Sequence, residues 1–161
     1  GFEESYGYLT GSYVRDKDGV DGAYMICEMF SYYATQGISL LDKLDELYKI
    51  YGYCLNTLHS YEFDGSAGFA KMQNIMQAFR GDIKAFGGKK VVKLLDYASG
   101  LEGLPKSDVL KFLLEDNCSI VVRPSGTEPK LKTYIAVSAE NKENAEKMEE
   151  EIRKSDEEYL Q

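Results

Sequence analysis

A polar loop between two apolar runs carries the residues best suited to chemistry. The loop is Arg123-Pro124-Ser125-Gly126-Thr127-Glu128-Pro129-Lys130-Leu131-Lys132. A guanidinium, two hydroxyls, two lysines and a glycine that lets backbone N–H groups approach a ligand match the donors that a phosphate group requires. The two prolines restrict the backbone and so reduce the entropy lost when a ligand binds. These residue types predict a phosphate-binding loop, and the alternative is a tight turn that carries Arg and Ser incidentally.

A second polar cluster lies at the start of the chain, in a glycine-punctuated stretch that we predict to be a loop over residues 1–17. Glu3 and Ser5 are two residues apart, so an extended backbone would direct both side chains to the same side. Such a pair suits hydrogen bonding to neighbouring sugar hydroxyls. The alternative is an acidic chain end that is simply solvated.

The loop at Arg123 connects two predicted strands, residues 118–122 and 131–138. A Walker-type nucleotide loop would need the pattern G-x-x-x-x-G-K-[ST] leading into a helix, which this loop lacks. Hydrophobic periodicity predicts the remaining elements. The predicted helices are 18–36, 39–51, 66–79 and 141–154, with Asp18 as the N-cap of the first and a capping pattern at Ser39-Leu40-Leu41-Asp42 in the second. The other predicted strands are 53–64, 89–97 and 108–115, with a hairpin turn at Asp116-Asn117. This order predicts an α+β fold, an antiparallel or mixed sheet with helices on one face.

The predicted helix over residues 18–36 is apolar or aromatic on nearly every side, as in helices that are buried all round. It would fit the core of a larger protein. In this chain we expect it to expose an apolar patch, with self-association as a consequence. A methionine-rich and aromatic cofactor pocket is the less favoured alternative.

Composition excludes several classes of function. The 161 residues carry a net charge of −8, which argues against a nucleic-acid partner, and 43% of them are hydrophobic, which suffices for a core. No apolar run approaches the ~20 residues of a membrane span, and the N-terminus lacks a signal-peptide pattern. The three cysteines are far apart in the sequence, which predicts reduced thiols and a cytoplasmic location.

The loop sequence resembles the phosphate-binding loop of the α-D-phosphohexomutases, the family of phosphoglucomutases and phosphomannomutases. In that family the loop lies in the fourth, C-terminal domain. The run Gly1-Phe2-Glu3-Glu4-Ser5-Tyr6-Gly7-Tyr8 resembles the sugar-binding loop of the third domain, and Val14-Arg15-Asp16-Lys17-Asp18 is similar to the basic segment that follows it. Glu-Glu-Ser, followed by Tyr8-Leu9-Thr10-Gly11, looks most like the bacterial phosphoglucomutase branch.

The resemblance implies that the chain is a C-terminal piece, because two family motifs are missing from it. These are the phosphorylated serine of the first domain and the Asp-Gly-Asp-x-Asp magnesium loop of the second. Residues 1–37 would be the end of domain three and residues 38–161 would be domain four, whose fold resembles that of the TATA-binding protein. The remaining domains of the parent enzyme would be its partners.

The resemblance also implies roles for single residues. Glu3 and Ser5 would bind ring hydroxyls of the sugar, and Lys17 would lie near the reacting oxygen as a proton-transfer or electrostatic group. The substrate phosphate would be anchored by Arg123, Ser125, Gly126, Thr127, Lys130 and Lys132.

The implied activity is that of a phosphoglucomutase, an isomerase that interconverts glucose 1-phosphate and glucose 6-phosphate through a phosphoserine. Glucose 1,6-bisphosphate would be the intermediate or activator, and Mg²⁺ would bind outside this chain. The chain alone is expected to be inactive. The alternatives are a phosphomannomutase or phosphopentomutase of the same family, or a non-catalytic module that binds phosphosugars.

Overall fold

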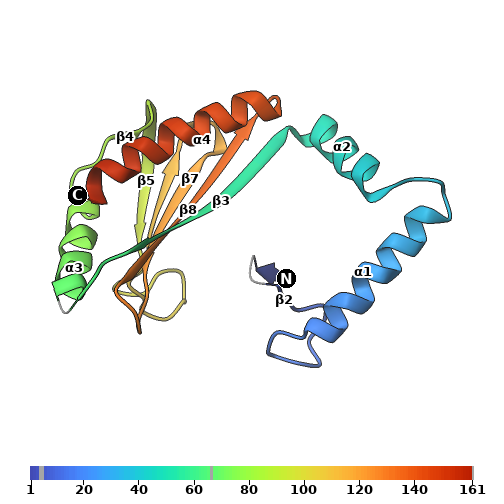
Figure 1. Ribbon diagram of the computed structural model, residues 1–161, viewed down its shortest axis with the longest axis horizontal. Helices are drawn as coiled ribbons and strands as arrows, with labels where there is room; N and C mark the ends of the chain where they lie inside the picture. Colours follow the sequence, from blue (N-terminus) through green and yellow to red (C-terminus); the bar gives the residue numbers. More distant parts are fainter. Residues whose placement is uncertain (4–5, 66, 161) are drawn as a thin grey trace. The chain divides into compact units, whose positions relative to one another are not determined.

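The computed structural model describes residues 1–3, 6–65 and 67–160 (Figure 1). Backbone contacts divide the chain into two compact units, Gly1–Ile50 and Tyr51–Gln161. The boundary expected after residue 37 separates two domains of a longer family protein, and it stays a prediction. The helices are α1 Gly19–Ala34, α2 Leu40–Tyr51, α3 Ala67–Phe79 and α4 Lys142–Glu157, with short 3₁₀ turns at Glu115–Asn117 and Glu158–Leu160. The strands are β1 Phe2–Glu3, β2 Gly7–Tyr8, β3 Tyr53–Glu62, β4 Ala85–Phe86, β5 Lys89–Asp96, β6 Leu110–Leu114, β7 Ser119–Pro124 and β8 Lys130–Ala139.

The N-terminal unit begins with a small hairpin, where the sequence had predicted only a loop. Strands β1 and β2 pair antiparallel, with Phe2 opposite Tyr8. Helix α1 packs against this hairpin at Gly22, because a Cβ there would lie 2.5 Å from the Tyr8 ring. Two residues per strand are too few to produce a detectable alternation of polar and apolar residues, which explains why the hairpin was missed.

The predicted capping residues of both N-terminal helices are confirmed. Asp18 Oδ1 accepts hydrogen bonds from the backbone N–H groups of Val20 and Asp21, at 3.0 and 3.1 Å. At the start of α2, Ser39 Oγ accepts from the N–H of Asp42 at 3.1 Å, and Asp42 Oδ2 accepts from the N–H of Ser39 at 3.1 Å. This reciprocal pair is a capping box, which satisfies donors that a helix start would otherwise leave unpaired.

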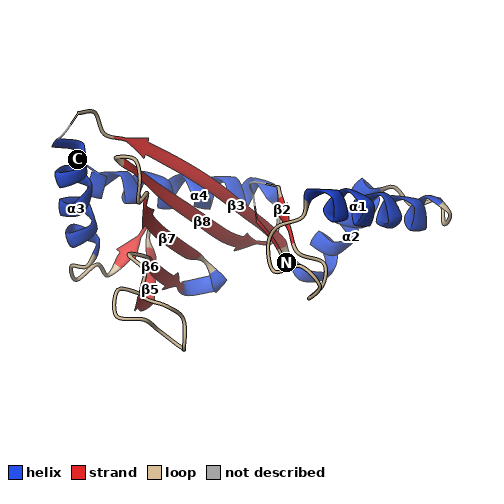
Figure 2. Cartoon of the chain, turned by 90° about the horizontal axis from the view of Figure 1, so that it is seen from below, coloured by secondary structure: helices blue, strands red, loops and turns tan. Residues whose placement is uncertain are grey.

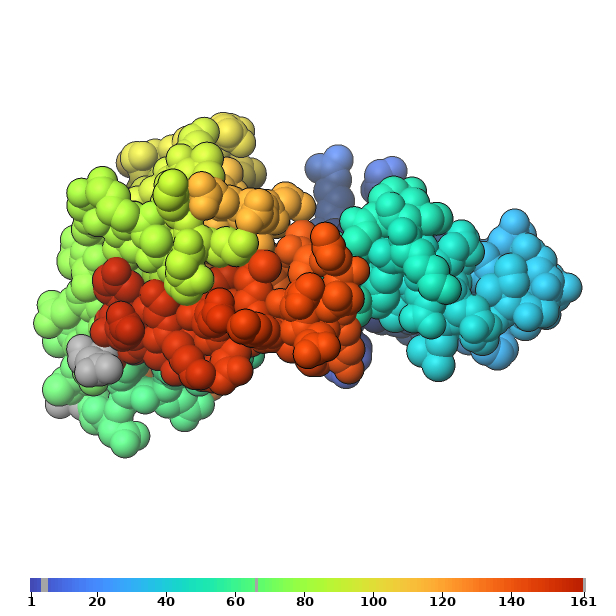
Figure 3. Space-filling view, turned by 90° about the horizontal axis from the view of Figure 1, so that it is seen from above, coloured from blue at the N-terminus to red at the C-terminus, as the bar shows by residue number. Residues whose placement is uncertain are grey.

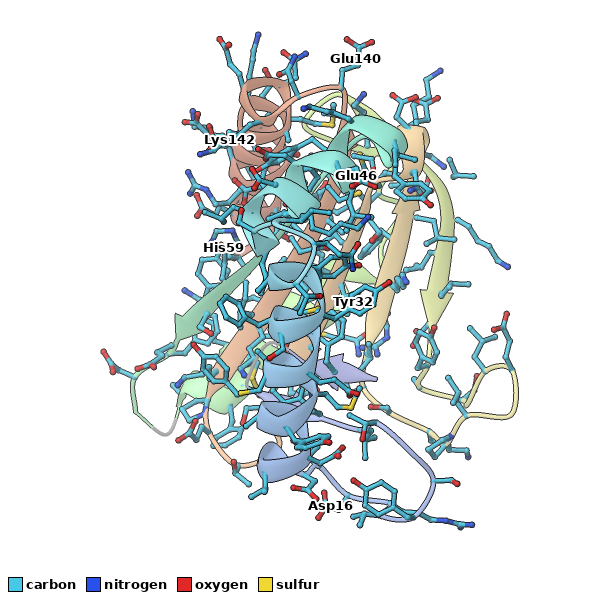
Figure 4. All side chains as sticks on the ribbon, turned by 90° about the vertical axis from the view of Figure 1, so that its right-hand side faces the viewer. Asp16, Tyr32, Glu46, His59, Glu140 and Lys142 are labelled. Carbon is cyan, nitrogen blue, oxygen red and sulfur yellow. The ribbon has the colours of Figure 1, made fainter. Side chains whose placement is uncertain are left out.

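Helix α1 exposes most of its apolar side chains, as the sequence predicted. Val20 is 83% exposed and Phe30 is 59% exposed, and of all the residues in α1 only Gly22 is buried. Figure 4 shows Tyr32 projecting from this helix. The self-association that we expect from such a surface stays a prediction.

The C-terminal unit contains a six-stranded sheet in the order β3-β8-β7-β6-β5-β4, with every pair of neighbours antiparallel. The predicted hairpin turn between β6 and β7 is present, with φ of 55° at Asp116 and 57° at Asn117. Asp and Asn tolerate this left-handed conformation better than other residues with side chains. Strand β4, with only two residues, was not predicted.

Helices α3 and α4 lie on the same face of the sheet (Figure 2), and α4 forms much of the surface in Figure 3. The core lies between them and the strands. It includes Met72, Met76 and Phe79 from α3, Ala145 and Ile152 from α4, and Phe86, Leu110, Phe112, Ile120, Val122, Leu131, Ile135 and Val137 from the sheet region. The predicted α+β architecture with helices on one face is therefore confirmed.

The opposite face of the sheet is open, and polar residues alternate with core residues along its strands. In β8 the pattern is regular, because Leu131 and Thr133 are buried whereas Lys130 and Lys132 are partly exposed. Strand β6 alternates in the same way. The open face ends at the loop between β7 and β8, and the connection of residues 97–109 between β5 and β6 lies at the same end of the sheet (Figure 1).

Candidate phosphate-binding site

The loop predicted to bind phosphate is a compact turn between β7 and β8. The backbone N–H of Ser125 donates to the carbonyl of Lys130 at 2.7 Å and closes the turn. Inside it, Ser125 Oγ accepts from the N–H groups of Thr127 and Glu128 at 3.4 and 3.3 Å. The Ser125 hydroxyl therefore holds the loop backbone in shape and remains near the surface, because the residue is only half-buried.

Arg123 and Lys132 are neighbours across the two strands that carry the loop. The register of the sheet pairs Arg123 with Lys132, and both side chains belong to the open face. Side chains that lie directly opposite in an antiparallel pair have Cβ atoms about 5 Å apart. Neither residue forms an ion pair with a carboxylate in the part of the chain that the structure describes. Two like charges held this close repel each other, so an anion bound between them would be favourable.

Gly126 and Thr127 form the exposed tip of the loop. A Cβ built on Gly126 would meet no heavy atom within 4 Å, so internal packing does not require a glycine there. Within the described residues, the Gly126 N–H donates no hydrogen bond. This N–H is thus accessible to an oxyanion, and the absence of a side chain keeps the approach open.

Lys130 has a different environment from the one that the sequence predicts. Its ammonium lies 2.8 Å from a Glu62 carboxylate oxygen and 3.6 Å from one of Glu128. The hydrogen bond with Glu62 raises the pKa of Lys130, and the same contact lowers the pKa of Glu62. The positive charge of Lys130 is therefore largely balanced within the chain, whereas the charges of Arg123 and Lys132 are not.

Two hollows lie in the C-terminal unit, and the first of them shares Glu128, Pro129 and Lys130 with the predicted loop. A pocket of about 280 Å³ lies beside the loop and is lined by Glu62, Phe63, Asp64, Gly65, Glu128, Pro129 and Lys130. Its three carboxylates would repel a phosphate group. A larger hollow of about 710 Å³ lies at the opposite end of the sheet, next to the Lys89–Asp116 ion pair and the start of α4.

Arg80 supports the end of the sheet where the loop lies. Its guanidinium donates to Asp96 Oδ2 at 2.9 Å and to Asp108 Oδ1 at 2.6 Å, and so joins the end of β5 to the residues before β6. The hydrogen bond from Arg80 holds the pKa of Asp96 below its usual value. These contacts fix both ends of the connection between β5 and β6.

The N-terminal candidates Glu3 and Lys17 are close together in their own unit. The Lys17 ammonium forms an ion pair with Glu3 Oε1 beside the β1–β2 hairpin. Gly7 allows this contact, because a Cβ there would overlap both side chains. Ser5 lies outside the described residues, so its predicted orientation stays a prediction.

Lys111 was not selected from the sequence but lies on the open face near the loop. It pairs with Val121 in the register between β6 and β7, two residues before Arg123. Sequence reasoning missed it because twelve residues and a turn separate it from Arg123. The only signal was a lysine between two apolar residues of a strand, which is typical of any half-exposed strand.

The sequence profile described as "Phosphoglucomutase/phosphomannomutase, C-terminal domain" matches residues 67–155, which include the whole loop. The chain belongs to this family. Its curated relatives include a phosphoglucomutase of Staphylococcus epidermidis, 33% identical over 153 residues, and one of Staphylococcus aureus strain MSSA476, 36% identical over 152 residues. These alignments cover 88% and 87% of this chain but only 28% and 27% of the relatives. The chain thus spans little more than a quarter of their length.

A solved structure shares the fold. It is the open form of the exocytosis-sensitive phosphoprotein pp63/parafusin (phosphoglucomutase) from Paramecium, with a TM-score of 0.65 and 22% identity. The match covers 98% of this chain and 29% of that one. The profile match confirms the family expected from the loop sequence, and this structure confirms the fold.

The residues that the structure describes contain no group of three or more His, Cys, Asp or Glu side chains placed to bind a metal ion. None of their helices is both long enough and apolar enough to cross a membrane.

Proposed function

We propose that this chain is the substrate-binding C-terminal part of a phosphoglucomutase, an isomerase that interconverts glucose 1-phosphate and glucose 6-phosphate. The observation that carries the proposal is the pair of unneutralised cations, Arg123 and Lys132, at the base of a loop with an open glycine tip. Family membership and the names of the staphylococcal relatives support it.

In this proposal the loop anchors the phosphate that is not reacting. The planar guanidinium of Arg123 grips two phosphate oxygens, and Lys132 adds a second positive charge from the neighbouring strand. The Gly126 N–H and the hydroxyls of Ser125 and Thr127 complete the donor set. An anchor that holds one end of the sugar phosphate allows the opposite end to meet the reacting group, because binding energy from a remote part can be used for the chemical step.

Glu3 and Lys17 are proposed to contact the sugar. The Glu3 carboxylate accepts hydrogen bonds from ring hydroxyls, and Ser5 shares this role. The ion pair with Glu3 orients the Lys17 ammonium, so that it can stabilise or protonate a reacting oxygen. These roles rest on the family motif and on the observed pair.

The rest of the catalytic apparatus is proposed to lie outside this chain. A phosphoserine passes its phosphoryl group to the substrate and forms glucose 1,6-bisphosphate, and Mg²⁺ at another domain supplies charge stabilisation there. The described residues do not include a metal-ligand cluster that fits this ion. The isolated chain is accordingly expected to bind substrate weakly and to lack mutase activity.

A titration with glucose 1-phosphate, followed by amide NMR of the 161-residue chain, tests the anchor. We expect shifts centred on residues 123–132 and a dissociation constant no tighter than ~1 mM, because association entropy offsets a few charge-assisted contacts. Arg123→Ala should abolish the shifts. Lys90→Ala, which removes a charge from the far end of β5, is the matched control and should leave them unchanged.

Gly126→Ala separates a binding loop from a plain turn. Because a Cβ at this position has free space, the variant should fold like the wild type and yet bind more weakly. If Gly126→Ala and Arg123→Ala both bind as well as the wild type, the anchor is contradicted. Parallel titrations with mannose 1-phosphate and ribose 1-phosphate test the sugar, and equal affinity for all three would contradict the glucose assignment.

A further inference from the structure

The open face of the sheet near the loop is basic, although the whole chain carries a net charge of −8. Lys111 belongs to this face, because it alternates along β6 with the buried residues Leu110 and Phe112. Arg123 and Lys132 lie on the same face of β7 and β8. Three adjacent strands therefore each contribute, at the loop end, one cation that has no ion pair among the described residues.

The register places Lys111 diagonally across from Arg123. Lys111 is opposite Val121, and Arg123 is two residues further along β7. Diagonal neighbours in an antiparallel pair lie about 7–8 Å apart, which is within reach of long side chains. The ammonium of Lys111 and the guanidinium of Arg123 can thus contact different oxygens of one phosphate group.

The surroundings of Lys111 hold its stem on the sheet and leave its charge available. Its strand neighbours are Leu95 on β5 and Val121 on β7, both half-buried and apolar. Lysine stems pack along apolar side chains while the ammonium stays in water. Within the described ranges, no carboxylate lies within ion-pair distance of Lys111.

We propose that Lys111 is a third cation of the phosphate site and donates from Nζ to an oxygen of the phosphate held by Arg123 and Lys132. This inference rests on the proposed function of the loop. It assigns to Lys111 the contact that the sequence predicted for Lys130, whose charge is already balanced by Glu62. The ligand is a phosphate monoester on a sugar, as for the rest of the site.

The test compares two lysines of the same face in the 161-residue chain. Lys111→Gln removes the proposed contact. Lys93→Gln removes an equal charge from β5, at a position opposite Leu113. Strand spacings place Lys93 roughly 17 Å from Arg123, beyond the screening length of about 10 Å at 0.1 M salt. A general loss of positive field would affect both variants, whereas a direct contact is lost in the first alone.

Glucose 1-phosphate and inorganic phosphate are the probes, and amide shifts of residues 123–132 give the dissociation constants. We expect Lys111→Gln to raise the constant about fivefold, which corresponds to a contact of about 1 kcal/mol. Lys93→Gln should change it by less than about twofold, and Lys111→Arg should restore wild-type binding. Lys111→Met, which keeps the stem and removes the charge, replaces the glutamine variant if that variant misfolds.

The outcomes separate this inference from the proposed function. The anchor stands if the wild type binds and Arg123→Ala does not. In that case the role of Lys111 is overturned if Lys111→Gln binds like the wild type or no worse than Lys93→Gln. If the wild type gives no loop shifts up to about 50 mM ligand, far above the expected constant, the anchor and Lys111 are both overturned.

Discussion

The carboxyl group of Asp156 should make the stability of this chain fall as the pH rises. Asp156 lies in the last turn of α4 and is 0% exposed, and among the described residues neither of its carboxyl oxygens has a hydrogen-bond partner. Burial raises its pKa from 3.8 to about 7, an effect that the nearby Thr133 hydroxyl partly opposes and that the charge of Glu157 increases. Tyr61 of β3 also lies at this end of the helix, where its hydroxyl donates to Glu157 Oε1 at 3.3 Å.

The direction of this change in stability with pH follows from proton binding. Between pH 4 and pH 7 the folded chain keeps the proton on Asp156 while the unfolded chain loses it, so the free energy of unfolding falls by about 1.4 kcal/mol per pH unit. Above pH 7 the carboxyl is ionised in both states and the decline stops. A shift from 3.8 to about 7 therefore costs about 3 kcal/mol between pH 4.5 and pH 8.5.

Asp156→Asn removes the ionisable group and keeps its shape. Urea unfolding of the wild type and the variant at several pH values gives the difference between their unfolding free energies. We expect the variant to gain about 3 kcal/mol relative to the wild type as the pH rises from 4.5 to 8.5. Glu146→Gln, an exposed position on the same helix, is the control and should give a nearly constant difference. Parallel profiles for wild type and Asp156→Asn would refute the reasoning.

Three further outcomes follow from other contacts. Gly68→Ala should destabilise the C-terminal unit by about 2–3 kcal/mol in urea unfolding, because the added Cβ would lie 2.4 Å from the Phe63 carbonyl oxygen. Unchanged stability would contradict this packing. Arg80→Ala should lower the free energy of unfolding by about 2 kcal/mol and speed amide hydrogen exchange over residues 97–109, since two partly buried carboxylates lose their partner. Unchanged exchange in that segment would show that the ion pairs of Arg80 do not order it. The chain should self-associate through α1 in sedimentation velocity at rising concentration, and Phe30→Glu should reduce this; equal association of the two would exclude α1 as the contact.

Local signals in the sequence predicted the helices and long strands of this fold well. The caps at Asp18 and Ser39 and the turn at Asp116-Asn117 depend on hydrogen bonds and dihedral angles within a few residues, so their residue types suffice to find them. The loop at Arg123 indicated the family for the same reason, since its residues are contiguous, whereas phosphate binding by this loop stays a prediction. The small β1–β2 hairpin and β4 have too few residues to give such a signal.

Contacts between distant strands could not be read from the sequence. The phosphate contact of Lys130 stays a prediction, and the sequence did not indicate that the pairing of β3 with β8 brings Glu62 opposite it. Lys111 was overlooked because its position beside Arg123 depends on the register of β6 and β7. The complete burial of Asp156 likewise depends on tertiary packing, because it follows from the position of this residue on the inner side of α4.

The two faces of the sheet explain how an acidic chain can present a site for an anion. Helix α4, which carries much of the acidic excess, covers one face, and its exposed carboxylates include those of Glu143, Glu146 and Glu150. The cations near the loop project from the opposite face. Because ionic screening limits interactions between exposed charges to about 10 Å, a small phosphate ester at the loop experiences mainly the local positive charge. A long polyanion would extend over a larger surface and be repelled by the acidic helix, so this distribution of charge favours a small phosphorylated ligand over a nucleic acid.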